Sequence, residues 1–144
     1  MLITICPLVW SRCTGIAKNH LDKINCNCDE RKNIITCSNL KTEPLEDKNF
    51  DSFEFYEIQI TNNNILKLLP NHFGSLRFER IVIRNNQKLT DINSTAFNTE
   101  FTNYLEIRDN KDLDGNQVIK FAQLFNNLQE IHITNNIKEI FALN

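Results

Sequence analysis

Residues 78–92 read FERIVIRNNQKLTDI, and the same pattern of apolar residues around an asparagine occurs again before and after them. Moving the pattern back by 23 residues matches Phe55, Ile58, Ile60, Asn63, Leu66 and Leu69. Moving it forward by 24 residues matches Leu105, Ile107, Asn110 and Leu113, and a fourth copy contains Leu128, Ile131, Ile133, Asn136, Ile137 and Ile140. Regular apolar spacing around a fixed asparagine, with a period in the twenties, predicts a stacked-repeat solenoid.

Each copy begins with a short alternating segment such as Ile81-Val82-Ile83. In a β-strand, alternate side chains point to opposite faces, so residues 81 and 83 share one face. One such strand cannot bury its apolar face alone, whereas parallel copies stacked at roughly 4.8 Å build a continuous core. We therefore expect parallel strands near residues 57–61, 80–84, 104–108 and 130–134.

An asparagine follows each expected strand: Asn63, Asn86, Asn110 and Asn136. The chain must turn there, which leaves backbone donors and acceptors without strand partners. A buried asparagine amide offers both a donor and an acceptor. The four side chains are therefore expected to form a ladder that satisfies the backbone of the turns.

These features resemble the extracellular leucine-rich repeat (LRR) family. The segments LPNHFG (69–74) and INSTAF (92–97) match the second half of that repeat, which ends in a convex-side phenylalanine. The string FGSLRFERI (73–81) is similar to arthropod secreted LRR proteins of the luciferin-monooxygenase non-catalytic subunit type. The resemblance implies an α/β horseshoe with short parallel strands on its concave face and irregular turns on its convex face.

Composition limits the class of protein. With 144 residues, 41% hydrophobic and 24% charged, the chain suits a single folded domain. A net charge of −2 argues against a nucleic-acid binder, which would need a basic surface. No apolar run approaches the roughly 20 residues of a membrane span.

The expected organisation has three parts. Residues 1–12 contain a short apolar run and are either a secretory signal or a leader without fixed structure, because no Lys or Arg precedes the run. Residues 13–54 form a cysteine cap with the first strand, and residues 55–144 hold about four repeats. Since no cysteine cap follows the last repeat, we expect the chain to be a fragment of a longer array; the alternative is that the last face meets a partner.

Four cysteines lie in the expected cap: Cys13, Cys26, Cys28 and Cys37. A region with little core is commonly stabilised by disulfides, although four cysteines allow three connectivities. A zinc site with His20 is the alternative, but one Cys-x-Cys is a poor match to the paired Cys-x-x-Cys of structural zinc. The LRR resemblance implies the pairs Cys13–Cys28 and Cys26–Cys37, and Cys6 is expected to leave with the leader.

Two further segments belong to the convex side. Residues 41–54 should form its first segment. Apolar residues recur at helical spacing over residues 116–128, and Asp114 or Asn116 could cap the start of a helix there. Asn93-Ser94-Thr95 is an N-glycosylation acceptor triplet on an expected convex loop.

The resemblance implies that the concave sheet face binds a partner. Seven outward positions are candidates: Arg80, Val82, Arg84, Tyr104, Glu106, Arg108 and His132. Adjacent strands would place Arg84 beside Arg108, and an unopposed pair of cations invites an anionic partner. The alternative is that these arginines pair with Glu57, Glu106 and Glu130 and form a solvated face.

No catalytic arrangement stands out, and we expect no enzyme activity, cofactor or metal. No Ser or Cys nucleophile has a placed base, and His132 beside Glu106 is expected to be a surface hydrogen bond. We expect a secreted LRR module that binds another protein, and neither nucleic acid nor a membrane. Two alternatives stay open: a non-catalytic subunit of a secreted enzyme complex, and a fragment of an LRR receptor ectodomain.

Overall fold

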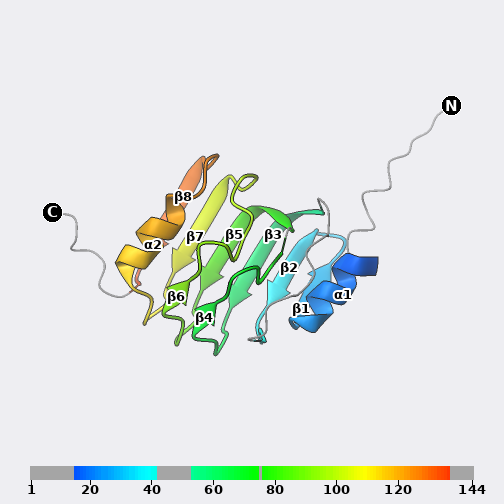
Figure 1. Ribbon diagram of the computed structural model, residues 1–144, viewed down its shortest axis with the longest axis horizontal. Helices are drawn as coiled ribbons and strands as arrows, with labels where there is room; N and C mark the ends of the chain where they lie inside the picture. The colour runs from blue at the N-terminus through cyan, green and yellow to red at the C-terminus, as the bar shows by residue number, and fades with distance from the viewer. Residues whose placement is uncertain (1–14, 42–52, 75, 137–144) are drawn as a thin grey trace.

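The computed structural model describes residues 15–41, 53–74 and 76–136, and its largest element is a six-stranded sheet (Figure 1). The strands follow in the order β1 (Cys26–Asp29), β2 (Ile34–Cys37), β3 (Glu54–Thr61), β5 (Arg77–Arg84), β7 (Tyr104–Arg108) and β8 (Glu130–Thr134). From β2 onward every neighbouring pair is parallel. The chain is therefore a mixed α/β β-solenoid of about four turns.

The strand register matches the sequence alignment. Residues that share a repeat position stand opposite each other, and they do so in two core rows: Ile35, Ile58, Ile81, Leu105 and Ile131, and then Cys37, Ile60, Ile83, Ile107 and Ile133. All but the two members on β8 are fully buried. The predicted parallel strands are thus confirmed, although β3 and β5 each begin three residues earlier than predicted.

The asparagine ladder is also confirmed. Asn86 shows its chemistry: its Oδ1 accepts from the backbone N–H of Asn63 at 2.9 Å, and its Nδ2 donates to the carbonyl of Ile60 at 2.9 Å. Asn110 and Asn136 repeat both bonds one and two turns later. Because all four ladder side chains are buried, they replace water as partners of the turn backbone.

The residue before each ladder asparagine has a left-handed backbone. These residues are Asn62, Asn85, Asp109 and Asn135, with φ between 55 and 59°. Asn and Asp enter this region more easily than other non-glycine residues. The pairs Asn-Asn and Asp-Asn in the sequence therefore encode a turn followed by a ladder position.

A second parallel sheet has two strands, β4 (Lys67–Leu68) and β6 (Asp91–Ile92). Each strand belongs to one solenoid turn and lies on the side opposite the six-stranded sheet (Figure 1). Here the constant alignment is wrong by one residue, because Leu68, not Leu69, stands opposite Ile92. Leu66, expected in the core, is 57% exposed, and Ile65 is buried in its place. Only one residue separates Asn63 from Ile65, whereas two separate Asn86 from Leu89, and this shorter step shifts the register.

A row of buried phenylalanines runs from one turn of the solenoid to the next. Phe73 stacks on Phe97 with ring centroids 4.7 Å apart, and Phe97 contacts Phe121 at 5.8 Å. Phe121 belongs to α2 (Gly115–Ala122), which Asp114 caps by accepting from the N–H of Asn116. The helix begins where predicted but ends six residues earlier than predicted.

The N-terminal end of the sheet is closed by a cap. Strand β1 pairs antiparallel with β2, and α1 (Gly15–Lys23), which the sequence did not predict, packs against β1 (Figure 1). A disulfide joins Cys26 to Cys37, which are opposite each other in the hairpin and are the pair that the resemblance implies. Because the two sulfurs are bonded to each other, neither is a thiolate that could bind zinc.

Several expectations fall outside the described residues. They concern the leader at residues 1–12, which contains Cys6, then Cys13, and residues 42–52 of the first convex segment. Cys28 is disulfide-bonded, but its expected pairing with Cys13 stays a prediction.

Candidate interaction surface

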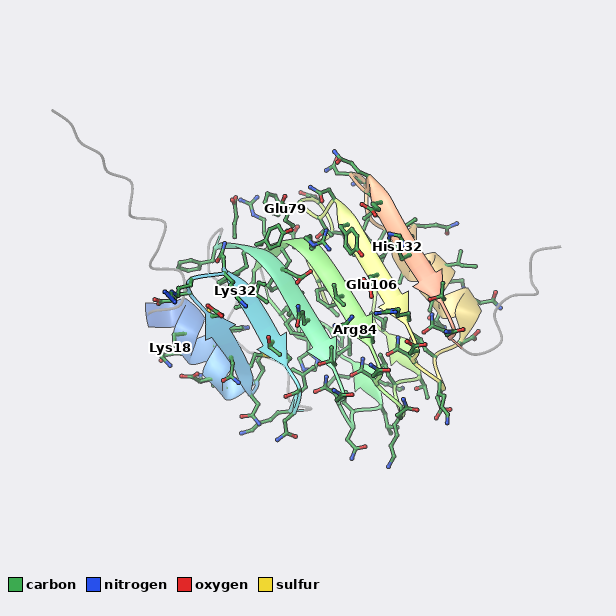
Figure 2. All side chains as sticks on the ribbon, turned by 180° about the vertical axis from the view of Figure 1, so that it is seen from behind. Lys18, Lys32, Glu79, Arg84, Glu106 and His132 are labelled. Atoms are coloured by element: carbon green, nitrogen blue, oxygen red, sulfur yellow. A yellow bond between two sulfur atoms is a disulfide. The ribbon has the colours of Figure 1, made fainter. Side chains whose placement is uncertain are left out.

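One face of the six-stranded sheet is turned away from β4, β6 and α2, and we call it the open face (Figure 2). The strand register arranges its outward residues in three columns. They are Glu57, Arg80, Tyr104 and Glu130; Gln59, Val82, Glu106 and His132; and Thr61, Arg84, Arg108 and Thr134. The seven candidate residues therefore come from β5, β7 and β8 and lie on one surface.

Glu106 is the centre of this surface. Its Oε2 accepts from Arg108 Nε at 2.7 Å and lies 3.8 Å from Arg84, while its Oε1 accepts from the Tyr104 hydroxyl at 2.8 Å. Burial alone would raise the pKa of Glu106, but the Tyr104 hydrogen bond and the two guanidiniums outweigh it and lower this pKa from its usual value. Glu106 is therefore a carboxylate at neutral pH.

The arginine pair is not unopposed, and the contacts with Glu57 and Glu106 are those that the alternative of paired arginines predicts. Arg84 and Arg108 share the single carboxylate of Glu106. Two positive charges against one negative charge leave one cation in excess. Because the side chains of Arg84 and Arg108 are 33% and 43% exposed, this excess charge faces solvent.

Arg80 and Tyr104 form a second contact on this surface. The guanidinium of Arg80 lies 3.6 Å from the centroid of the Tyr104 ring, and Arg80 Nε donates to Glu57 at 3.0 Å. Tyr56 adds a ring 5.6 Å from the same guanidinium. Burial and the hydrogen bond to Glu106 together raise the pKa of Tyr104.

Tyr56 and Glu57 were not among the candidates. In the pairing of β3 with β5, Phe55 stands opposite Phe78 and Glu57 stands opposite Arg80, but the strand register leaves out Tyr56 between them. Tyr56 is 43% exposed, whereas the next two residues, Glu57 and Ile58, are both buried, so the alternation is broken there. A Phe-Tyr-Glu run that breaks strand alternation is the signal that could have found it.

Val82 and His132 differ from expectation. Val82 is only 4% exposed on this surface, so a partner would touch the polar side chains around it first. His132 stands opposite Glu106 in the register, yet its Nε2 lies 2.8 Å from Glu130 on its own strand. The proposed His132–Glu106 hydrogen bond is therefore wrong, and the His132 ring instead lies 5.5 Å from Tyr104.

His72 is fully buried in the turn between β4 and β5. Its Nδ1 accepts from the Leu69 N–H at 3.1 Å, so its other ring nitrogen carries the proton that bonds the Lys41 carbonyl at 3.0 Å. Burial lowers the pKa of His72, and the hydrogen bond to the Lys41 carbonyl raises it. Burial has the larger effect, so the pKa is lowered from its usual value. The ring is a neutral link between two turns of the chain.

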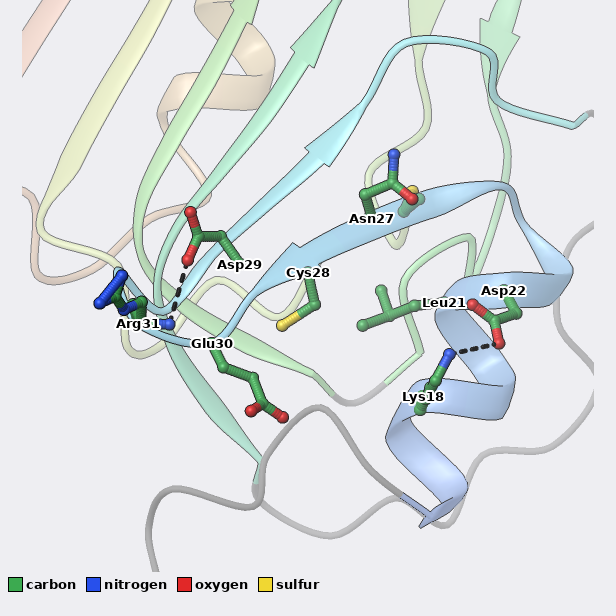
Figure 3. A pocket seen from close by; sticks show the side chains of 9 residues that line it. Lys18, Leu21, Asp22, Asn27, Cys28, Asp29, Glu30 and Arg31 are labelled. Carbon is green, nitrogen blue, oxygen red and sulfur yellow. Dashed lines mark hydrogen bonds and ion pairs between the residues drawn. The ribbon is translucent and has the colours of Figure 1, made fainter.

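The cap contains a groove of about 550 Å³ between α1 and β1 (Figure 3). Three of its charged side chains have partners within the cap: Lys18 pairs with Asp22 at 3.0 Å, and Asp29 accepts from the backbone N–H of Arg31 at 3.0 Å.

Within residues 15–41, 53–74 and 76–136, no three His, Cys, Asp or Glu side chains gather as a metal site would require. The helices in the same ranges are too short or too polar to span a membrane. Comparison with known proteins gives no match to a family model, to a curated protein or to a solved structure.

Proposed function

We propose that this chain is an LRR-type binding module that recognises a protein partner through the open face. The observation that carries the proposal is the arrangement of Arg84 and Arg108 around one shared carboxylate. A carboxylate from a partner can form a bidentate hydrogen bond with a guanidinium, which is the stronger form of this contact. The partner is accordingly expected to present acidic side chains at the carboxyl ends of β5 and β7.

Arg80 and Tyr104 support the same surface. Arginine and tyrosine are enriched among residues that dominate binding energy at interfaces. Stacking and the bond to Glu57 hold Arg80 in one position, so little side-chain entropy is lost when a partner docks. The Arg80–Tyr104 contact would thus be a preformed apolar and cationic platform beside the excess charge.

Secretion is part of the proposal, and the buried Cys26–Cys37 disulfide supports it. Such bonds persist in oxidising compartments and are rare in the cytosol.

Differential capture tests the function. Wild-type protein, an Arg84→Glu/Arg108→Glu variant and a Lys67→Glu/Lys111→Glu control would be immobilised and exposed to extracellular protein from the source organism. Both variants change the net charge equally, but Lys67 and Lys111 lie in β4 and in a turn. The proposal predicts a protein that wild type and control retain and the arginine variant loses, with affinity at least tenfold lower, or about 1.4 kcal/mol.

Equal retention by all three proteins would contradict the proposal. If the protein retained is an enzyme, this chain would be the non-catalytic subunit that the arthropod resemblance implies.

A further inference from the structure

A second groove lies on the other side of the molecule, between α2 and the turn that follows β6. It measures about 320 Å³ and is lined by Asp91, Ile92, Asn93, Ser94, Gln117, Lys120, Phe121 and Leu124. This volume is at the small end of the range for small-molecule sites, which suits one sugar residue better than a large ligand. The groove is separate from the open face.

Asn93 and Ser94 of the lining belong to the only N-glycosylation triplet in the sequence, Asn93-Ser94-Thr95. Asn93 Oδ1 accepts from both the backbone N–H and the hydroxyl of Thr95, each at 2.8 Å. These bonds fix the amide by its oxygen. The Nδ2 atom, to which a sugar is attached, makes no hydrogen bond to the described part of the chain.

The groove also has the mixed chemistry that a sugar requires. Gln117 and Lys120 are three residues apart on α2 and so share one face of the helix. Neither Lys120 nor Asp91 forms an ion pair within the described ranges. Leu124 is 37% exposed and supplies an apolar surface at the groove.

We propose that Asn93 carries an N-linked glycan whose first N-acetylglucosamine lies in this groove. The apolar face of the sugar ring covers Leu124, while its hydroxyl and acetamido groups hydrogen-bond Gln117 and Lys120. The sugar thereby fastens α2 to the turn after β6. This inference rests on secretion, which is part of the proposed function, but not on recognition by the open face.

The attachment uses a lipid-pyrophosphate oligosaccharide as donor and a transferase of the secretory pathway. A bond forms between C1 of the first sugar and Asn93 Nδ2, and the bond from C1 to the pyrophosphate oxygen breaks. The displaced proton of Nδ2 leaves, and the electron pair of the broken bond stays on the lipid pyrophosphate.

The experiment compares three forms of the protein made in a eukaryotic secretory host. One keeps the whole glycan, one is trimmed by an endoglycosidase to a single N-acetylglucosamine, and one loses all sugar to an amidase that converts Asn93 to Asp. The full-glycan and single-sugar forms should melt together, about 3 °C above the sugar-free form. Asn93→Asp and Thr95→Ala variants, which carry no sugar, should melt with the sugar-free form.

A matched pair of leucine variants locates the contact. Leu124→Ser should remove the difference between the single-sugar and sugar-free forms. Leu66→Ser changes a leucine that is exposed outside the groove and should leave this difference in place. Absence of any glycan at Asn93, or equal melting of the single-sugar and sugar-free forms, overturns the inference; neither result alters the expected outcome of the Arg84 and Arg108 capture experiment.

Discussion

On the core side of β3, β5 and β7, Ile58 stands opposite Ile81, which stands opposite Leu105. On the open face of the same strands, Glu57 stands opposite Arg80, which stands opposite Tyr104. Core residues must fill the same space in every turn, so packing selects the same kind of residue each time. Outward residues are free of that requirement, and their variety is where a specific partner can be encoded.

The largest expected effect comes from breaking the repeated side. Asn86→Ala removes the acceptor of the Asn63 N–H and the donor to the Ile60 carbonyl. Each buried backbone group left without a partner costs about 1–3 kcal/mol, so the free energy of unfolding should fall by roughly 2–6 kcal/mol in urea denaturation. Asn85→Gly is the control, because glycine adopts the left-handed backbone of this exposed neighbour and should change stability by less than about 1 kcal/mol. Equal losses in both variants would show that the ladder has no special role.

The cap should be next in magnitude. The Cys26–Cys37 disulfide closes a loop with a sequence separation of 11, for which chain entropy gives about 3 kcal/mol of stabilisation. A Cys26→Ala/Cys37→Ala variant should lose about that much in the same denaturation assay. If reduced wild-type protein unfolds at the same urea concentration as oxidised protein, the cap is stabilised by packing alone.

His72 is an exception to the repetition within the core. It precedes Phe73, and the equivalent residue before Phe97 in the next repeat is Ala96. Above about pH 6.5 the ring is neutral in both the folded and the unfolded chain, so its protonation does not affect stability. As the pH falls below this value, the unfolded chain binds a proton that the folded chain resists. The free energy of unfolding should then fall by at most about 1.4 kcal/mol per pH unit.

A His72→Gln variant should lose stability at neutral pH but show a flatter slope between about pH 6.5 and 5. Glu106 does not interfere, because its pKa is lowered from the usual carboxyl value and its contribution is lost only as the pH falls into the range where carboxylates bind protons. Parallel pH profiles for wild type and variant would remove His72 as the cause.

The smallest effect on stability is expected on the open face. Arg84→Gln/Arg108→Gln replaces partly exposed side chains without adding a carboxylate beside Glu106, so its unfolding free energy should change by only about 1 kcal/mol. Glu106→Gln sharpens the comparison, because it releases both guanidiniums and should strengthen binding of an acidic partner severalfold. Weaker binding by Glu106→Gln would mean that the partner needs the carboxylate itself.

Much of the fold could be predicted because its determinants are local and repeated. The apolar rows and the ladder asparagines recur at nearly constant spacing, and the strand register then follows from parallel stacking. The prediction fails where the spacing changes by one residue, as it does between Asn63 and Ile65. A constant shift cannot detect such a step, because Leu66 is as apolar as Ile65.

The candidate surface was predictable in position and in part of its contacts, since Glu57 and Glu106 were named as alternative partners of the arginines. The columns follow from strand register, which places Arg84 beside Arg108. Sequence spacing does not specify side-chain rotamers. It therefore could not predict that Arg84 and Arg108 share Glu106, or that His132 pairs with Glu130 on its own strand. His72 was missed for a related reason: its two backbone partners, Leu69 and Lys41, lie 3 and 31 residues away.

Amide hydrogen exchange tests the stacked-turn architecture most directly. The backbone N–H groups of Asn63, Asn86 and Asn110 each donate to the next ladder side chain at 2.9–3.0 Å. All three should exchange slowly in the wild-type protein, and Asn86→Ala should speed exchange most at Asn63, which loses its acceptor. Fast exchange at all three amides in the wild-type protein would contradict the account, because amides in solvent-exposed turns behave in that way.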